Sequence, residues 1–202
     1  SGNLLALPSL WTVEPWLTAW STAQIGVQPT GLKPYFINSF LMVVPAVVIS
    51  TLIGALNGYI LTQFNFRGAH LLFAAMLFSV FIPFQIVLIP MAKTLGLLGL
   101  AGTVKGLVLV HVVYGIGFST LFFRNYYAAF PSELIRSARM DGATLWDEFT
   151  QVIRPLAMGT LASTGLLCLV LSWNEAFWSL NLSAAKAGTL AALIASYSSP
   201  EG

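Results

Sequence analysis

The sequence predicts an all-α protein, a polytopic bundle of transmembrane helices, and two features lead to this prediction. Charged residues make up 8% of the 202 residues and apolar residues 57%, whereas ordinary soluble domains have about 25% and about 45–50%. Four continuous apolar stretches are also long enough to cross a hydrocarbon core, which needs about 20 residues. Helices are expected in them because lipid offers no partner to backbone polar groups, and a transmembrane barrel would show alternating segments of about ten residues instead.

The four spans are expected at residues 36–61, 69–92, 104–123 and 156–177. Pro83 and Pro90 lie inside the second span and predict kinks in it. Gly54 and Gly58 form a small-xxx-small pair in the first span, which lets another helix approach closely, and packing inside the chain is favoured over packing against another subunit. The apolar stretch 189–197 is too short to cross and is interpreted as an interfacial helix or the approach to a further span.

Residues 1–202 are interpreted as one transmembrane domain, of which residues 1–35 form an extracytoplasmic segment rich in Trp, Pro and Gly. Because the chain does not begin with Met, it is interpreted as a fragment. The two sides of the membrane would carry Arg67, Arg124, Arg136, Arg139 and Arg154, against Lys33, Lys93, Lys105 and Lys186. The excess of one positive charge weakly favours the cytoplasm for the side that carries the arginines, and both ends of the fragment would then lie outside.

The long polar connection at residues 131–155 predicts two short helices around a turn. Pro131 and Ser132 suit a helix start, and Gly142 after Asp141 can adopt the positive φ that ends the first helix. The residues from Thr144 onward then fit a capping box in its acidic form. From these features alone, an ordinary amphipathic connector on the membrane is favoured over a rigid lever that a soluble partner grips.

A resemblance to a known family changes this interpretation of the loop. Residues 136–155, RSARMDGATLWDEFTQVIRP, resemble the cytoplasmic "EAA" loop of binding-protein-dependent ABC importer permeases, with Ala138, Gly142, Val152 and Pro155 at matching or near-matching positions. In that family the loop docks in a cleft of the ATPase and carries its motion into the membrane. The resemblance implies an ATPase-coupling role for Arg136, Ser137, Ala138, Arg139, Asp141, Gly142 and Ala143.

The loop departs from the family pattern at three positions. Arg136 stands where the family has Glu, Ser137 where it has its first Ala, and Arg154 where it has Leu. The resemblance therefore carries over the helix–Gly–helix geometry, but not a contact between that Glu and the ATPase.

Other residues resemble the carbohydrate-importing branch of the family, the maltose-type second permease. They are Asn38-Ser39, residues 64–68, Pro83-Phe84-Gln85, Pro90, residues 95–97 with Thr103, and Trp173-Asn174-Glu175. The resemblance implies a six-span permease subunit in the bacterial inner membrane that translocates a sugar. The first and last of these spans are then expected to lie outside residues 1–202. The implied partners are the lipid bilayer, a second homologous permease, an ATPase dimer that binds ATP and Mg, and an extracytoplasmic solute-binding protein. The alternatives are a permease for another small polar solute and a non-transporting scaffold or sensor subunit.

Glu175 is the only carboxylate inside or at the edge of a predicted span, and ionisable groups there usually face a polar cavity or a partner. The candidates for a substrate path are Gln85, Trp173, Asn174, Glu175 and Asn181. Equally open is an interface role, with Glu175 as a hydrogen-bond acceptor and Trp173 as an anchor. His70 and His111 are isolated and are expected to pack or bond at an interface, and Cys168 is expected to be a small packing residue.

Several classes of function are disfavoured, and no catalytic or metal-binding residue is predicted. No Gly-Lys pair occurs, so the chain has no P-loop, and ATP hydrolysis would fall to a partner. Ser119 lacks the following Gly of a serine-hydrolase motif, and no HExxH motif is present. The net charge of +2 without a basic run gives no reason to expect a nucleic acid partner, and one cysteine gives no metal cluster.

Overall fold

The computed structural model describes residues 12–25, 30–182 and 188–198, and the regular elements of this part of the chain are helices. They are α1 (Glu14–Ser21), α2 (Lys33–Gln63), α3 (Ala69–Phe81), α4 (Phe84–Leu97), α5 (Val104–Ala128), α6 (Ser132–Met140), α7 (Leu145–Asp147), the π-helical segment η1 (Glu148–Ile153), α8 (Arg154–Trp173), α9 (Phe177–Leu182) and α11 (Leu190–Ser198). The predicted all-α class is confirmed.

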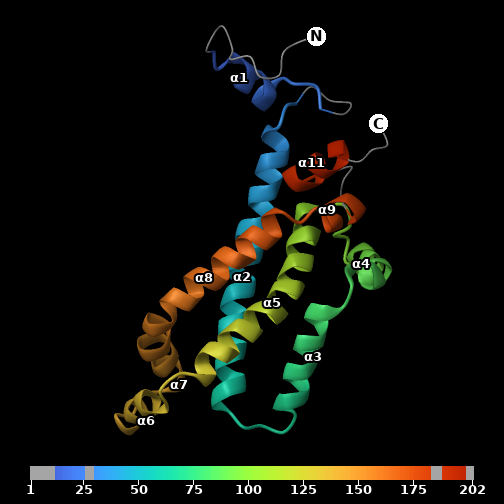
Figure 1. The fold of residues 1–202 in the computed structure, drawn as a ribbon. Coiled ribbons are helices and arrows are strands. Elements are labelled where there is room, and N and C mark those ends of the chain that lie inside the picture. The colour runs from blue at the N-terminus through green and yellow to red at the C-terminus, as the bar shows by residue number, and fades with distance from the viewer. Residues whose placement is uncertain (1–11, 26–29, 183–187, 199–202) are drawn as a thin grey trace.

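Three helices of the described chain are long and apolar enough to cross a membrane. They are α2, α5 and the continuous helix Leu145–Trp173, which runs through α7, η1 and α8. The pair formed by α3 and α4 passes the same criterion only when both are counted together. The four predicted spans are therefore three unbroken helices and one broken pair, with α2 and α5 side by side along the length of the bundle (Figure 1).

The prediction of one kinked helix over residues 69–92 is wrong in its geometry. The chain is extended at Ile82 and Pro83, and the axes of α3 and α4 meet there at 104°. A proline lacks the N–H that continues a helix and disfavours helical conformation in the residue before it. With 13 residues, α3 is about 20 Å long, short of the roughly 30 Å of a hydrocarbon core. Pro90, by contrast, lies inside α4 without ending it.

Other boundaries differ by a few residues from the expected ones. Helix α2 begins at Lys33, and α8 ends at Trp173, so Glu175 lies in the link between α8 and α9 instead of inside the span. Helix α11 falls on the short apolar stretch expected at 189–197. Of the expected extracytoplasmic segment, residues 1–11 and 26–29 lie outside the described residues, as does Lys186.

Helices α2 and α5 are in close contact at the two glycines of the small-xxx-small pair. A Cβ added at Gly58 would lie 2.7 Å from the Cβ of Phe123 and 2.7 Å from the backbone nitrogen of Arg124, and one at Gly54 would meet Ser119. The favoured interpretation, packing inside the chain, is confirmed. Small residues allow this approach because apolar helices in lipid associate through close packing.

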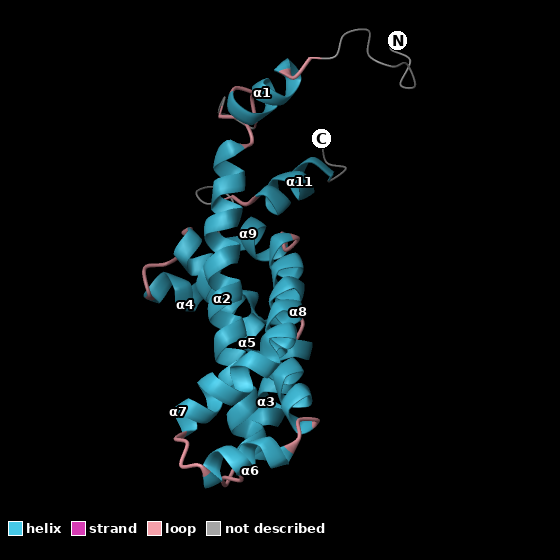
Figure 2. Cartoon of the chain, turned by 90° about the vertical axis from the view of Figure 1, so that its left-hand side faces the viewer, coloured by secondary structure: helices cyan, strands magenta, loops and turns pink. Residues whose placement is uncertain are grey.

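Two apolar clusters hold the described helices together, one toward each end of the bundle. The first is built around Val43, Leu107, Val110 and Trp178, and the second is formed by Ala55, Tyr59, Phe123, Tyr127, Ile135, Ile153 and Ala157. Helices α6 and α7 lie at one end, beside the connection from α2 to α3, and α1, α9 and α11 lie toward the other (Figures 1 and 2). Which end faces the cytoplasm stays a prediction.

Candidate functional site

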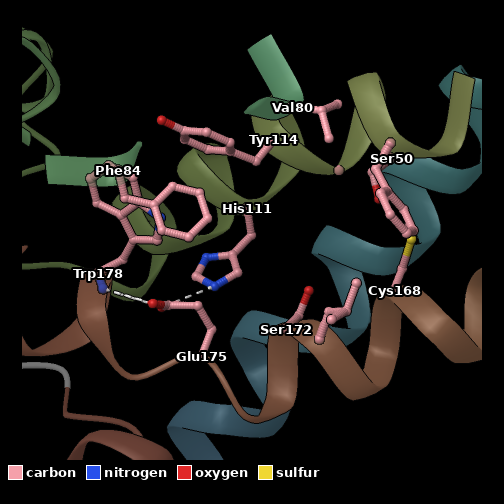
Figure 3. Close-up of a pocket in the computed structure, with 12 residues that line it drawn as sticks. Ser50, Val80, Phe84, His111, Tyr114, Cys168, Ser172, Glu175 and Trp178 are labelled. Atoms are coloured by element: carbon pink, nitrogen blue, oxygen red, sulfur yellow. Dashed lines mark hydrogen bonds and ion pairs between the residues drawn. The ribbon is translucent and has the colours of Figure 1, made fainter. Parts of the chain in front are cut away.

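A cavity of about 290 Å³ lies between α2, the broken pair, α5, α8 and the start of α9. It is lined by Ser50, Val80, Phe84, His111, Tyr114, Gly115, Phe118, Cys168, Leu171, Ser172, Glu175 and Trp178 (Figure 3). The break at Pro83 contributes to this cavity, because it places Phe84 at the start of α4 against α5 and α9.

His111 and Glu175 form the polar part of the lining. The ring of His111 bonds through Nδ1 to the backbone oxygen of Leu107 at 2.8 Å, so Nδ1 carries a proton. Its Nε2 is buried without a hydrogen-bond partner and lies 3.6 Å from a carboxylate oxygen of Glu175 (Figure 3). The side chains are only 5% and 16% exposed. The expectation that His111 is isolated is therefore wrong, although its bond to Leu107 is the packing role expected.

Glu175 is held in place by the helix that follows it. Both of its carboxylate oxygens accept from the backbone N–H of Trp178, at 3.1 and 3.2 Å, in the first turn of α9. A carboxylate is favourable at such a helix N-terminus because the free N–H groups carry partial positive charge. The orientation of the carboxylate is therefore set by the backbone of α9 and does not depend on an interaction with His111.

Aromatic rings form a second side of the cavity. The ring centroids of Phe84 and Tyr114 lie 5.1 Å apart, and both rings approach Trp178, at 5.7 and 5.5 Å. The rings come from α4, α5 and α9, so the cluster depends on the fold and not on local sequence. A carboxylate and an imidazole opposite aromatic rings can bind a small solute that has both hydroxyl groups and apolar C–H faces.

Of the five substrate-path candidates, the structure brings Glu175 to the cavity lining and places four outside it. Trp173 is half-buried at the end of α8, with its ring against Phe36. Asn174 and Asn181 are exposed, and each donates its side-chain amide to the backbone oxygen four residues earlier, at 2.8 and 2.7 Å. Gln85 is exposed on α4.

The predicted coupling loop has the expected turn. Gly142 follows α6 with a φ of 85°, a conformation that favours glycine. Thr144 accepts from the backbone N–H of Asp147, and Asp147 accepts from that of Thr144, so the predicted capping box is confirmed. The second helix does not stop at Pro155, however. It continues as one helix into α8, because proline is tolerated in the first turn after the π-helical segment.

The loop residues differ in how they are held. Arg136, Ser137, Asp141 and Gly142 are exposed, and Ala138 and Ala143 are half-buried. Arg139 is also exposed, but its guanidinium forms an ion pair with the buried Glu148. Glu148 was not among the candidate site residues expected from the sequence. Its burial depends on Tyr59, which lies on a distant helix and gave no local signal.

Neither a metal site nor a reactive cysteine emerges in the part of the chain that is described. It contains no group of three or more His, Cys, Asp or Glu side chains placed to hold a metal ion. Cys168 is buried, with its sulfur 3.5 Å from the hydroxyl oxygen of Ser119. The expected packing role of this cysteine is confirmed.

The apolar spans and the helix–turn–helix at one end of the bundle define a multi-pass membrane protein. Residues 35–199 match the family described as the binding-protein-dependent transport system inner membrane component, and the chain belongs to this family. The resemblance drawn from residues 136–155 is thereby confirmed.

Two relatives are named as uptake permeases. The chain is 31% identical over 170 residues to the diacetylchitobiose uptake system permease of Streptomyces coelicolor. The aligned residues make up 84% of this chain and 54% of the relative. The chain is 36% identical to the osmoprotective compounds uptake permease of Synechocystis, over 74% of this chain and 50% of the relative. The chain thus spans about half the length of these relatives.

A solved structure shows the same fold. A chain in the crystal structure of a bacterial ABC transporter involved in the import of the acidic polysaccharide alginate is similar, with a TM-score of 0.69 and 25% identity. The similarity covers 80% of this chain and 56% of that chain.

Proposed function

We propose that this chain belongs to a permease subunit of an ATP-driven importer, and that the subunit translocates a sugar delivered by an extracytoplasmic binding protein. The observation that carries the proposal is the coupling loop. Helix α6 stands at one end of the bundle and is exposed along most of its length. The helix after the Gly142 turn runs without a break into a membrane span, so a force on the loop reaches the membrane.

Energy would come from another chain. Because the sequence has no P-loop, ATP and Mg would be bound by an ATPase dimer whose surface holds α6. A second permease of the same family would complete the membrane pathway. The similarity to a chain of an ABC transporter supports this assembly.

The cavity supports a sugar as the solute. Sugars have apolar C–H faces that pack on aromatic rings and hydroxyl groups that donate and accept hydrogen bonds. The three rings at α4, α5 and α9 offer the first kind of contact, and Glu175 with the free Nε2 of His111 offers the second. The volume of about 290 Å³ is near the lower end of ligand pockets, roughly 300–1,000 Å³.

A second candidate solute is a small polar osmolyte, because one relative is named for osmoprotective compounds. A scaffold or sensor subunit without transport is the third possibility. The deciding experiment co-expresses the full-length subunit with the partner genes beside it and reconstitutes the purified complex in vesicles. Retention of the ATPase and ATP-dependent uptake of a labelled neutral disaccharide support the proposal. Uptake of glycine betaine alone favours the osmolyte, and a subunit that retains no ATPase contradicts the importer.

Glu175→Gln is expected to lower the uptake rate at low solute concentration about tenfold or more. A hydrogen bond to a charged group contributes about 1.5–3 kcal/mol, and about 1.4 kcal/mol is a factor of ten. Assembly and basal ATPase activity should stay near the parent values, because the glutamine oxygen can still accept from the N–H of Trp178. Initial uptake rates over a range of solute concentrations measure the effect.

Asn174→Ala is the matched control for this prediction. Asn174 is adjacent in sequence but exposed, and its amide bonds to its own helix at Val170, so its loss should change uptake little. Equal uptake kinetics in the parent and in Glu175→Gln would leave Glu175 only its role in holding α9.

A further inference from the structure

Glu148 is a fully buried carboxylate at the place where the coupling loop meets the membrane helices. One of its oxygens accepts a hydrogen bond from the hydroxyl of Tyr59 on α2. Arg139 on α6 donates from Nε and Nη2 to the two oxygens, at 2.8 and 3.1 Å. Three separate elements, α2, α6 and η1, therefore share one carboxylate.

The surroundings of this carboxylate are apolar. The ring of Tyr59 lies against those of Tyr127 and Phe149, with centroids 5.9 and 5.6 Å away. Ile135 of α6 and Ile153 of η1 are buried in the same cluster. Hydrogen bonds are stronger in such low-dielectric surroundings, and an unpaired charge there is costly. The stability of the charged Glu148 therefore depends on both of its donors.

The ion pair is also directional. The guanidinium of arginine is always charged, and its planar fork matches the two oxygens of a carboxylate. The hydrogen bond to Glu148 raises the pKa of Arg139 above its ordinary value. An apolar contact would let two helices slide past each other, whereas this pair fixes their relative orientation.

Helix α6 has few other attachments. Ile135 is the one buried residue among its nine. A helix anchored through a single apolar side chain can turn about that contact, and Gly142 at its end gives the backbone further freedom. The bond from Arg139 to Glu148 is the second point of attachment that prevents such a rotation.

We propose that Glu148 is a positioning residue that clamps α6 to α2, so that a displacement of α6 by its partner moves α2 directly. We call Tyr59, Glu148 and Arg139 the clamp. Without it, the displacement would pass along the chain into α5 and α8 and through the apolar contact of Ile135, which does not fix the orientation of α6 on α2. The proposal rests on the proposed coupling function of the loop, which supplies the displacement. A π-helical segment at Glu148 fits this role, since such segments are frequent at functional sites.

The test measures the distance between α6 and α2 by double electron–electron resonance in the full-length protein. Nitroxide labels are placed at Met140→Cys on α6 and Ile60→Cys on α2, which are 88% and 43% exposed. The background is cysteine-free and includes Cys168→Ser. Distances are recorded in the isolated subunit and in the assembled complex, without nucleotide and after trapping with ATP and vanadate.

With the clamp intact, we expect one narrow distribution whose mean distance is the same in both nucleotide states. Tyr59→Phe removes one hydroxyl and keeps the ring contacts, and Glu148→Gln removes the charge and keeps the shape. Both variants should broaden the distribution about twofold and make its mean depend on nucleotide, because each leaves one buried group without its full set of partners.

Tyr126→Phe is the matched control. It also removes a hydroxyl hydrogen bond at this end of the bundle, to the backbone oxygen of Leu156 at 2.9 Å, but outside the clamp. If the clamp residues only stabilised the fold, Tyr59→Phe, Glu148→Gln and Tyr126→Phe would all lower thermal stability, and in none of them would the distance depend on nucleotide. That result would contradict the proposal.

Distributions identical to the parent in Tyr59→Phe and Glu148→Gln would overturn the proposal. If Glu148→Gln fails to fold, Tyr59→Phe decides alone. Failure of the parent to retain an ATPase would contradict the proposed function, whereas the width measured in the isolated subunit still tests the clamp.

Discussion

Replacing Gly58 by leucine is expected to prevent α2 and α5 from packing, so that little folded protein is recovered from the membrane. The added Cβ would lie 2.7 Å from the backbone nitrogen of Arg124 and 2.7 Å from the Cβ of Phe123. Backbone atoms cannot rotate out of the way, so the helices would have to separate. Overpacking costs about 1–3 kcal/mol and occasionally more, and we expect the upper end here. Thermal unfolding of the full-length subunit in detergent, followed by size-exclusion chromatography, measures the loss.

Gly159→Leu provides the control for this experiment. Gly159 lies on α8, and an added Cβ there would meet no atom within 4 Å. Because leucine forms helices better than glycine by up to about 1 kcal/mol, this variant should be as stable as the parent or slightly more stable. Both variants should still insert, since insertion depends on the hydrophobicity of the segments. An unfolding temperature for Gly58→Leu equal to that of Gly159→Leu would contradict the close packing of α2 on α5.

Gly142→Val is expected to leave insertion and binding-protein docking intact and to uncouple or detach the ATPase. Gly142 has a φ of 85°, where a residue with a Cβ costs roughly 1–2 kcal/mol, and a branched one costs more. An added Cβ would meet no atom within 4 Å, so the penalty comes from the backbone and would be relieved by a change in the angle between α6 and α7. Co-purification of the ATPase and ATP-dependent uptake of a labelled disaccharide measure the effect, which we expect to be a loss of uptake of about tenfold or more.

A series of substitutions at this position separates backbone strain from loss of a small residue. Asparagine tolerates the left-handed region better than other residues with a Cβ, so Gly142→Asn should retain most of the uptake, with Gly142→Ala between Asn and Val. The order Asn, Ala, Val follows the cost of the positive φ. Wild-type ATPase association and uptake in Gly142→Val would mean that residues 136–155 are an ordinary surface loop.

Much of the fold could be predicted from the sequence because the signals were local. The apolar lengths of α2 and α5, the turn at Gly142 and the capping box at Thr144 each depend on a few neighbouring residues. The second span shows the limit of this reasoning. Its hydropathy is continuous from α3 into α4, yet the backbone turns through 104° at Pro83. Hydropathy measures the preference for lipid, and it does not register the backbone restriction that a proline imposes.

The candidate sites could be predicted only in part. Glu175 stood out because a carboxylate at a span end is costly, and the structure places it in the cavity lining. Its neighbour His111 belongs to another helix and appeared isolated. Glu148 lies in a polar loop, where a carboxylate usually faces solvent, so its burial could not be predicted from the sequence.

The sequence by itself determined that this chain spans a membrane with helices, where its extramembrane loop turns, and to which family it is similar. The first two properties follow from composition, from hydrophobic length and from backbone preferences of single residues, and the similarity to the family rests on the motif of residues 136–155. Only the tertiary structure decided that α2 and α5 pack at Gly54 and Gly58, that His111 faces Glu175, and that Glu148 is buried between Tyr59 and Arg139. The physical reason is that the burial and pairing of a charge depend on side chains that distant helices bring together. A local sequence pattern contains no information about such contacts.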